Sequence, residues 1–87
     1  MKVVVLYRPV SDHARRVEEF VHDFKHHEPK RRIETIDVDS PQGISLANLY
    51  DIVAYPAVIA LRDDGQLLKH WQGDEWPLMN ELAFYAQ

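Results

Sequence analysis

The sequence of 87 residues predicts an α/β domain in which strands and helices follow one another in the order βαβαββα. Three observations carry this prediction. The continuous apolar run Val3–Leu6 indicates a strand that is buried on both faces. Apolar residues recur every three or four positions from Ala14 to Phe24, which indicates an amphipathic helix. Asp63-Asp64-Gly65 separates two strand-like segments and indicates a tight turn.

The first half of the chain is expected to form a strand, a helix and a second strand. The first strand, Lys2–Tyr7, ends near Pro9, which has no backbone N–H to donate to a sheet. Ser11 is expected to cap the following helix, with Asp12 in its first turn. Strict alternation over 33–39 predicts a strand near a sheet edge. A right-handed crossover would make these two strands parallel.

The second half is expected to add a helix, a hairpin and a final helix. The second helix opens at Ser40-Pro41 or at Gln42-Gly43. Ala57–Leu61 predicts an apolar strand, and Leu67–Trp71 a strand that returns antiparallel to it. Asp74 is expected to cap the last helix. These elements make a four-stranded mixed sheet with helices on both faces, in one domain that spans residues 1–87.

Composition excludes several classes of function. Ten Lys and Arg residues stand against 14 Asp and Glu, and the net charge of −4 argues against a nucleic-acid partner. No apolar run approaches the roughly 20 residues of a membrane span, and the first strand is too short for a signal-peptide core. We therefore expect a cytoplasmic protein without a membrane partner. The chain has no cysteine, which excludes disulfides, thiolate nucleophiles and dithiol redox chemistry.

The order of elements and three segments resemble the thioredoxin-like fold in its glutaredoxin-sized form. The segment Val3–Pro9 is similar to the first strand of that family and its approach to the active-site loop. Ala54–Ile59 is similar to its cis-proline loop and third strand, and Arg62–Leu67 with Gly73 to its terminal hairpin. Where the family has Cys-x-x-Cys, this chain has Ser11-Asp12-His13-Ala14, so disulfide exchange does not carry over.

The resemblance implies a shallow apolar groove between the helix start and the proline loop. Its expected lining consists of Val10, Ser11, His13, Tyr55, Pro56 and Gly73. Trp71 or Trp76 could add to its wall. Such a groove could accept a peptide by short β-augmentation. The alternative is that Pro56 only turns the chain and that both tryptophans belong to the core.

The leading hypothesis is therefore a redox-inactive thioredoxin-fold module that binds a peptide, a protein segment or a small ligand. A second hypothesis is an enzyme that handles glutathione or another thiol ligand, with Ser11 as hydrogen-bond donor, as a serine does in some glutathione transferases of this fold. A third is a structural domain that self-associates through the strand edge Leu67–Trp71 or Ile33–Val38. The oligomeric state stays open.

Three other clusters are expected to be structural or solvated. Ser11 and His13 are too close along a helix to face one another, so a Ser-His-Asp site is not expected. His22 and His26 could bind zinc with His27 or Glu18, but a solvated helix face explains them better. The segment Lys30–Arg32 is expected to be a solvated connector. No metal, cofactor or catalytic residue is predicted.

Overall fold

The computed structural model describes residues 1–87, and all seven predicted elements form in the predicted order. Their bounds are β1 (Lys2–Tyr7), α1 (Ala14–His27), β2 (Ile33–Asp37), α2 (Pro41–Leu49), β3 (Ala57–Leu61), β4 (Leu67–Gln72) and α3 (Met79–Tyr85). The protein is an α/β domain with a four-stranded mixed sheet and three helices. No helix has both the length and the apolar character that crossing a bilayer requires.

The sheet has the strand order β2-β1-β3-β4, so β1 and β3 are central and β2 and β4 lie at the edges. The strands β1 and β2 are parallel, as predicted, and Val5 lies opposite Thr35. On its other side β1 pairs antiparallel with β3, where Val5 lies opposite Val58. The hairpin β3–β4 is antiparallel and contains a register irregularity between Ala60 and Leu61.

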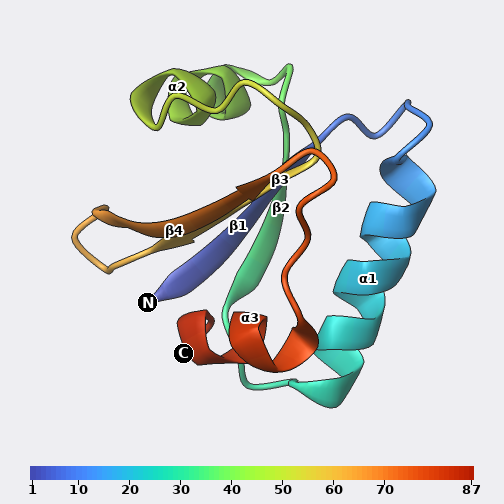
Figure 1. The fold of residues 1–87 in the computed structure, drawn as a ribbon, viewed down its shortest axis with the longest axis vertical. Helices are drawn as coiled ribbons and strands as arrows, with labels where there is room; N and C mark the ends of the chain where they lie inside the picture. The colour runs from blue at the N-terminus through green and yellow to red at the C-terminus, as the bar shows by residue number, and fades with distance from the viewer.

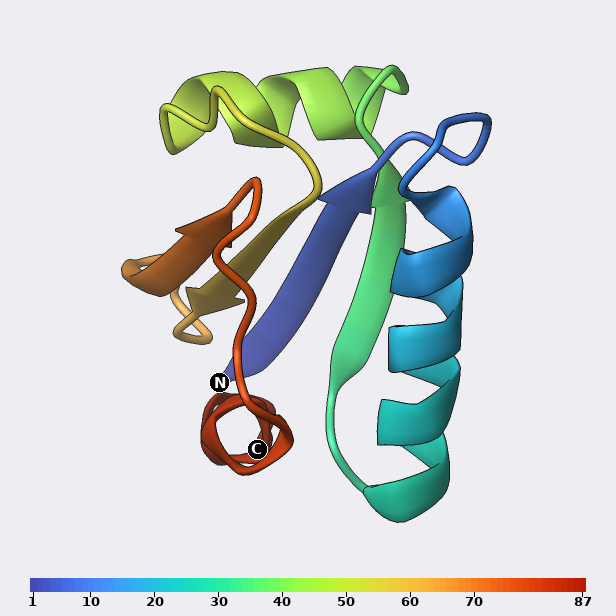
Figure 2. The ribbon, with the colours of Figure 1, turned by 45° about the vertical axis from the view of Figure 1, so that its right-hand side comes forward.

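Helices cover both faces of the sheet, as predicted (Figures 1 and 2). Along β1, Val3, Val5 and Tyr7 point to one face and join a buried cluster with residues of α1 and α3. Val4 and Leu6 point to the other face and join a cluster against which α2 packs. A strand covered on both faces has no exposed side, which explains why the sequence of β1 is continuously apolar.

Two predicted helix caps are wrong. The residue that precedes α1 is His13, and no side chain caps this helix. The Ser11 hydroxyl instead donates to the Arg8 carbonyl, 2.6 Å away. The last helix begins at Met79 rather than at Asp74. Pro77 disfavours helical geometry at the residue before it, which keeps Trp76 and the preceding residues out of α3.

The cap of α2 and the end of β2 are set by hydrogen bonds within a few residues. The Ser40 hydroxyl accepts from the Gly43 amide at 3.0 Å, and Pro41 begins the helix, so the first of the two predicted starts is confirmed. The strand β2 ends at Asp37, earlier than Asp39. The Asp37 carboxylate accepts from the Asp39 amide at 2.8 Å, and this local turn competes with extension of the strand.

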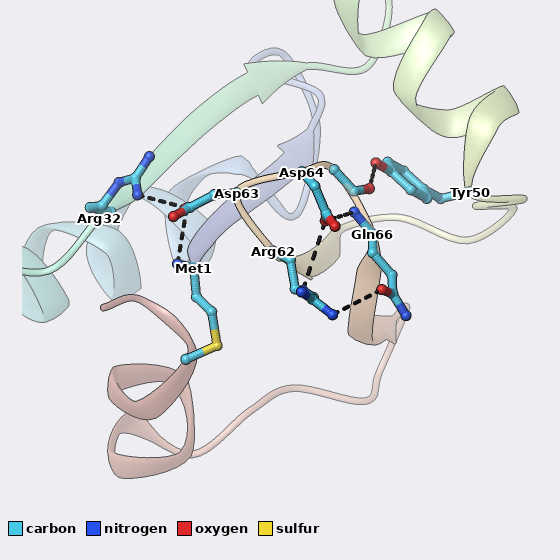
Figure 3. A network of polar contacts seen from close by, with 8 residues as sticks. Met1, Arg32, Tyr50, Arg62, Asp63, Asp64 and Gln66 are labelled. Carbon is cyan, nitrogen blue, oxygen red and sulfur yellow. Dashed lines mark hydrogen bonds and ion pairs between the residues drawn. The ribbon is translucent and has the colours of Figure 1, made fainter.

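The turn between β3 and β4 carries a network of polar contacts (Figure 3). Gly65 has a φ of 91°, which is the positive value that the turn prediction requires. The Asp63 carboxylate pairs with Arg32 at 3.0 Å and with the Met1 ammonium at 3.1 Å. Hydrogen bonds from these two cations lower the pKa of Asp63. The Tyr50 hydroxyl donates to the Gly65 carbonyl and ties the end of α2 to the turn.

Candidate ligand-binding pocket

A pocket of about 300 Å³ lies between α1 and the segments before β3 and after β4. Its lining consists of His13, Arg16, Val17, Phe20, Pro56, Gly73, Asp74 and Trp76. The first four residues are spaced at intervals of three and four, so they occupy one face of α1 and the turn that begins it. A single helical face therefore supplies one whole side of the pocket.

The apolar wall of the pocket is an aromatic pair. The rings of Phe20 and Trp76 pack edge to face, with centroids 5.2 Å apart and planes at 80°. This geometry is favourable for aromatic rings and orients both of them. Trp76 is only partly buried, whereas Trp71 is 6% exposed and belongs to the core beside Tyr85. The two tryptophans thus separate into one pocket residue and one core residue.

Pro56 and Gly73 are held together on the side opposite α1. The Gly73 amide donates to the Pro56 carbonyl at 2.9 Å, and Gly73 has a φ of 63°. The side-chain oxygen of Gln72 accepts from the Val53 and Ala54 amides at 3.0 and 3.2 Å. The peptide bond between Tyr55 and Pro56 is cis. These bonds tie the end of β4 to the loop that leads into β3.

Tyr55 differs from its neighbours because its backbone is unpaired. Neither its amide nor its carbonyl forms a hydrogen bond with the rest of the chain. Its side chain packs on the cluster at the opposite face of the sheet, where the Arg8 guanidinium lies 5.5 Å from the ring centroid. The backbone amide and carbonyl of Tyr55 are thus free to bond a ligand beside the pocket, although the Tyr55 ring lies on the other face of the sheet.

The loop that precedes α1 folds back onto Arg8. The amide of Arg8 donates to His13 Nε2 at 3.1 Å, and its carbonyl accepts from Ser11 at 2.6 Å. Ser11 and His13 are therefore each bonded to Arg8 and not to one another. Val10, at the tip of the loop, is 97% exposed. In this arrangement His13 belongs to the pocket lining, and Val10 and Ser11 do not.

Three residues of the predicted groove line the pocket, namely His13, Pro56 and Gly73. Val10, Ser11 and the Tyr55 side chain do not, because the loop turns toward Arg8 and the tyrosine ring turns to the other face. Trp76 forms the wall that was predicted for one of the tryptophans.

Four lining residues were not predicted from the sequence: Arg16, Val17, Phe20 and Asp74. Val17 and Phe20 had been assigned to the buried stripe of the helix; this is confirmed for Val17, which is 2% exposed, whereas Phe20 is only partly buried. The spacing from His13 through Phe20 is a signal that could have found three of the four.

The polar groups in and near the pocket include charges of both signs and a buried tyrosine. Arg16 and Asp74 bring opposite charges to the lining. The Tyr7 ring lies 6.4 Å from the His13 ring, and its hydroxyl donates to Glu18 at 2.9 Å. Burial raises the pKa of Tyr7, and the hydrogen bond to Glu18 raises it further. Tyr7 therefore stays protonated near neutral pH and is a poor base or nucleophile there.

The histidines near the end of α1 contact one another and the helix backbone. His27 Nδ1 lies 2.8 Å from the Asp23 carbonyl, one turn earlier in the helix. The rings of His26 and His27 pack edge to face, with centroids 5.6 Å apart. No group of three or more His, Asp or Glu side chains has an arrangement that could hold a metal ion.

Comparison with known proteins gives a likeness of fold. No protein-family model matches the chain, and no curated protein matches it. A solved structure described as that of a malarial protein is similar, with a TM-score of 0.60 and 21% sequence identity. The match covers 94% of this chain and 90% of that chain. At this identity the likeness shows a shared fold and nothing about activity.

Proposed function

We propose that this chain is a redox-inactive thioredoxin-like domain that binds an extended peptide segment of a partner protein in the pocket beside Pro56. The observation that carries the proposal is the position of the pocket next to the unpaired backbone of Tyr55. An extended peptide needs main-chain partners and a recess for a side chain, and these two features lie side by side.

Several features support the thioredoxin-like assignment. The element order, the parallel pair β1–β2 and the cis bond before Pro56 agree with the resemblance noted in the sequence. In such proteins the start of the first long helix carries the reactive cysteines, and here that position holds Ser11 to Ala14. A serine hydroxyl cannot form or break a disulfide, so binding without redox chemistry is the function that this fold can still perform.

The lining of the pocket indicates the side chain that it would accept. Phe20 and Trp76 are partly buried and offer carbon surface from which an apolar side chain can displace water, which is favourable, whereas Val17 and Pro56 are buried. Arg16 and Asp74 supply charges of both signs around this apolar part. The preferred ligand is thus a peptide with one large apolar residue, flanked by residues that tolerate a polar environment.

No observation favours a glutathione-handling enzyme. The Ser11 hydroxyl donates its hydrogen bond to the Arg8 carbonyl, 2.6 Å away, and Ser11 does not line the pocket. A hydrogen bond to a bound thiolate would require that contact to break.

Self-association through the β4 edge is also disfavoured. At the β4 edge, Lys69 pairs with Glu81 at 2.8 Å, and the β3–β4 register is irregular near that edge. Charges and irregularities of this kind oppose pairing with a second strand.

The proposal can be tested with capped hexapeptides that differ at one central position, which is Phe, Leu, Ser or Asp. We expect the Phe and Leu peptides to shift the backbone amide resonances of Tyr55, Gly73 and Phe20, and the Asp peptide to shift them least. Phe20→Ala should abolish these shifts. Phe84→Ala, which removes an exposed aromatic ring of α3 away from the pocket lining, is the matched control and should preserve them.

Two outcomes would contradict the proposal. The first is that none of the peptides perturbs these amides at millimolar concentration. The second is that reduced glutathione shifts Ser11 and its neighbours while the peptides do not, which would favour the enzyme.

A further inference from the structure

We infer that Ser11 and His13 form a pH-sensitive latch on the backbone of Arg8, and that protonation of His13 opens the latch and reshapes the edge of the pocket. The effect on ligand binding rests on the proposed function. The effect on Arg8 follows from the contacts alone and can be measured without a ligand.

The latch consists of two side chains that satisfy both polar backbone groups of one residue. The Arg8 amide donates to His13 Nε2 at 3.1 Å, and the Arg8 carbonyl accepts from the Ser11 hydroxyl at 2.6 Å. The Ala14 amide donates to the Ser11 carbonyl at 3.3 Å. Arg8, the last residue before Pro9, is thereby joined to the start of α1, and the loop between them is closed.

The bond between Arg8 and His13 specifies the protonation state of the ring. A backbone amide can only donate, so Nε2 must carry a lone pair and the single ring proton must lie on Nδ1. An imidazolium has a proton on both nitrogens. Its Nε2–H would face the N–H of Arg8, and the hydrogen bond would be replaced by a repulsion between two donors. Histidine side chains in general gain this proton between about pH 8 and pH 5.

The groups around His13 come from three elements. From β1, the Tyr7 ring lies 6.4 Å away, and its hydroxyl is bound to Glu18 of α1. Arg16 of α1 and Asp74 after β4 share the pocket lining with His13.

Two further charges lie close to His13 in sequence. Asp12 is exposed, and the Arg8 side chain is paired with Asp39 at 3.2 Å. His13 also stands at the N-terminal end of α1, where the helix dipole disfavours a cation. Both the facing N–H donor of Arg8 and the helix dipole therefore oppose an imidazolium at this position, and we expect the charged ring to move away from the Arg8 amide.

Opening the latch would alter the pocket because His13 belongs to its lining. A ring that leaves Arg8 no longer has a fixed position, and the loop from Pro9 to Asp12 loses one of its two side-chain tethers. The loss of a single hydrogen bond corresponds to a change of about three- to tenfold in an equilibrium constant. Because this bond lies within the protein, its loss lowers peptide affinity by no more than its effect on the closed latch, and we expect a fall of at most about this factor when the pH is lowered from 8 to 5.

The test is a pH titration of the whole chain followed by ¹⁵N NMR. We expect the Arg8 amide and the His13 ring to titrate with the same midpoint, and the ring to carry its proton on Nδ1 at pH 8. In His13→Gln, whose side-chain oxygen accepts at every pH, the Arg8 titration should disappear. His22→Gln, on the exposed part of α1, is the matched control and should leave the Arg8 titration unchanged.

Three results would overturn the latch. The first is a proton on Nε2 of His13 at pH 8. The second is an Arg8 amide resonance whose titration midpoint differs from that of the His13 ring. The third is an unchanged titration of the Arg8 amide in His13→Gln. The first two are measured on the unsubstituted protein, so the inference stays falsifiable even where the variant fails to fold.

Peptide titrations at pH 8 and pH 5 separate the latch from the proposed function. If the Arg8 amide follows His13 but no peptide binds at either pH, the latch stands and the proposed function fails. If a peptide binds equally at both values, control of the pocket by the latch is wrong and the proposed function stands. A fall in affinity at pH 5 that is absent in His13→Gln supports both.

Discussion

Gly43, in the first turn of α2, lies so close to the main chain of Asp37 that a Cβ atom at this position would overlap the Asp37 carbonyl oxygen. The same atom would lie 2.9 Å from the Cα atom of Val38. Both neighbours are backbone atoms, which cannot rotate away as the end of a side chain could. The glycine therefore sets the distance at which α2 packs on the end of β2.

Gly43→Ala should destabilise the protein by about 2 kcal/mol or more, because the helix must shift away from β2. Helix propensity alone predicts the opposite, a gain of about 1 kcal/mol. Urea unfolding followed by far-UV circular dichroism measures the difference. Gln42→Ala, on the exposed surface of the same turn, is the control and should change the free energy of unfolding little. A Gly43→Ala variant as stable as the natural chain would mean that the close approach is not required.

Ser40→Ala and Ser11→Ala should differ in their effects on stability. Ser40 caps α2 through the Gly43 amide, and its loss should cost about 1 kcal/mol. Ser11 caps no helix, and its exposed bond to the Arg8 carbonyl can be replaced by water. We expect a loss below about 0.5 kcal/mol for Ser11→Ala. The free energies of unfolding of the two variants measure the difference. Equal losses for the two variants would mean that Ser11 stabilises the start of α1.

Asp63 should make the stability of the protein fall as the solution becomes acidic. Its pKa is lower in the folded chain than the ordinary value of 3.8, because the Met1 ammonium and then Arg32 donate hydrogen bonds to the ionised form. A carboxyl whose pKa is lower in the folded state stabilises the fold at pH values above its pKa in the unfolded state. This stabilisation is lost as the pH falls through the pKa of the folded state. Asp63→Asn should therefore flatten the dependence of the free energy of unfolding on pH below about pH 5.

The control for Asp63 is Asp12→Asn, because the exposed Asp12 carboxylate forms no ion pair. This variant should keep the acid dependence of the natural chain. Since Asp63 is exposed, 1 M salt should reduce the effect by screening. An identical pH profile for Asp63→Asn and the natural chain at low salt would show that the ion pairs have no energetic role.

Trp76 and Trp71 should respond differently to a soluble quencher. In Trp71→Phe the only tryptophan is the partly buried pocket residue, and in Trp76→Phe it is the core residue, which is 6% exposed. Acrylamide should quench the emission of the first variant more strongly, because collision requires access to the ring. A ligand that fills the pocket should protect Trp76 alone. Equal quenching in two folded variants would indicate that the pocket is closed in solution.

Local sequence patterns were sufficient for most of the fold. The apolar run in β1, the helical spacing from Ala14 onward and the turn at Gly65 each involve residues close together in the chain, so they predict their elements directly. The cap at Ser40 was found for the same reason. The cap at Ser11 was wrong because its hydroxyl has a competing partner three residues earlier, and a preference for caps cannot choose between two local hydrogen bonds.

The pocket was predicted only in part, because its two sides come from distant segments. His13, Pro56 and Gly73 were found through the resemblance to a known family, whereas Phe20 was assigned to the core. Its spacing places it on the apolar side of α1, but only the path of the chain after β4 brings Trp76 against it. Apolar spacing alone does not distinguish a pocket-lining phenylalanine from a buried one, and only the position of Phe20 on the same helical face as His13 points to the pocket.

The amino-acid sequence alone determined the order of the elements, the two-sided burial of β1 and the absence of thiol chemistry. These follow from residue type and from spacings of two to four residues. Tertiary structure decided which tryptophan meets the pocket, why Gly43 must lack a side chain, and how Ser11 and His13 come to share Arg8. Such relationships depend on how segments pack in space, and the free energy of that packing is absent from any short stretch of chain.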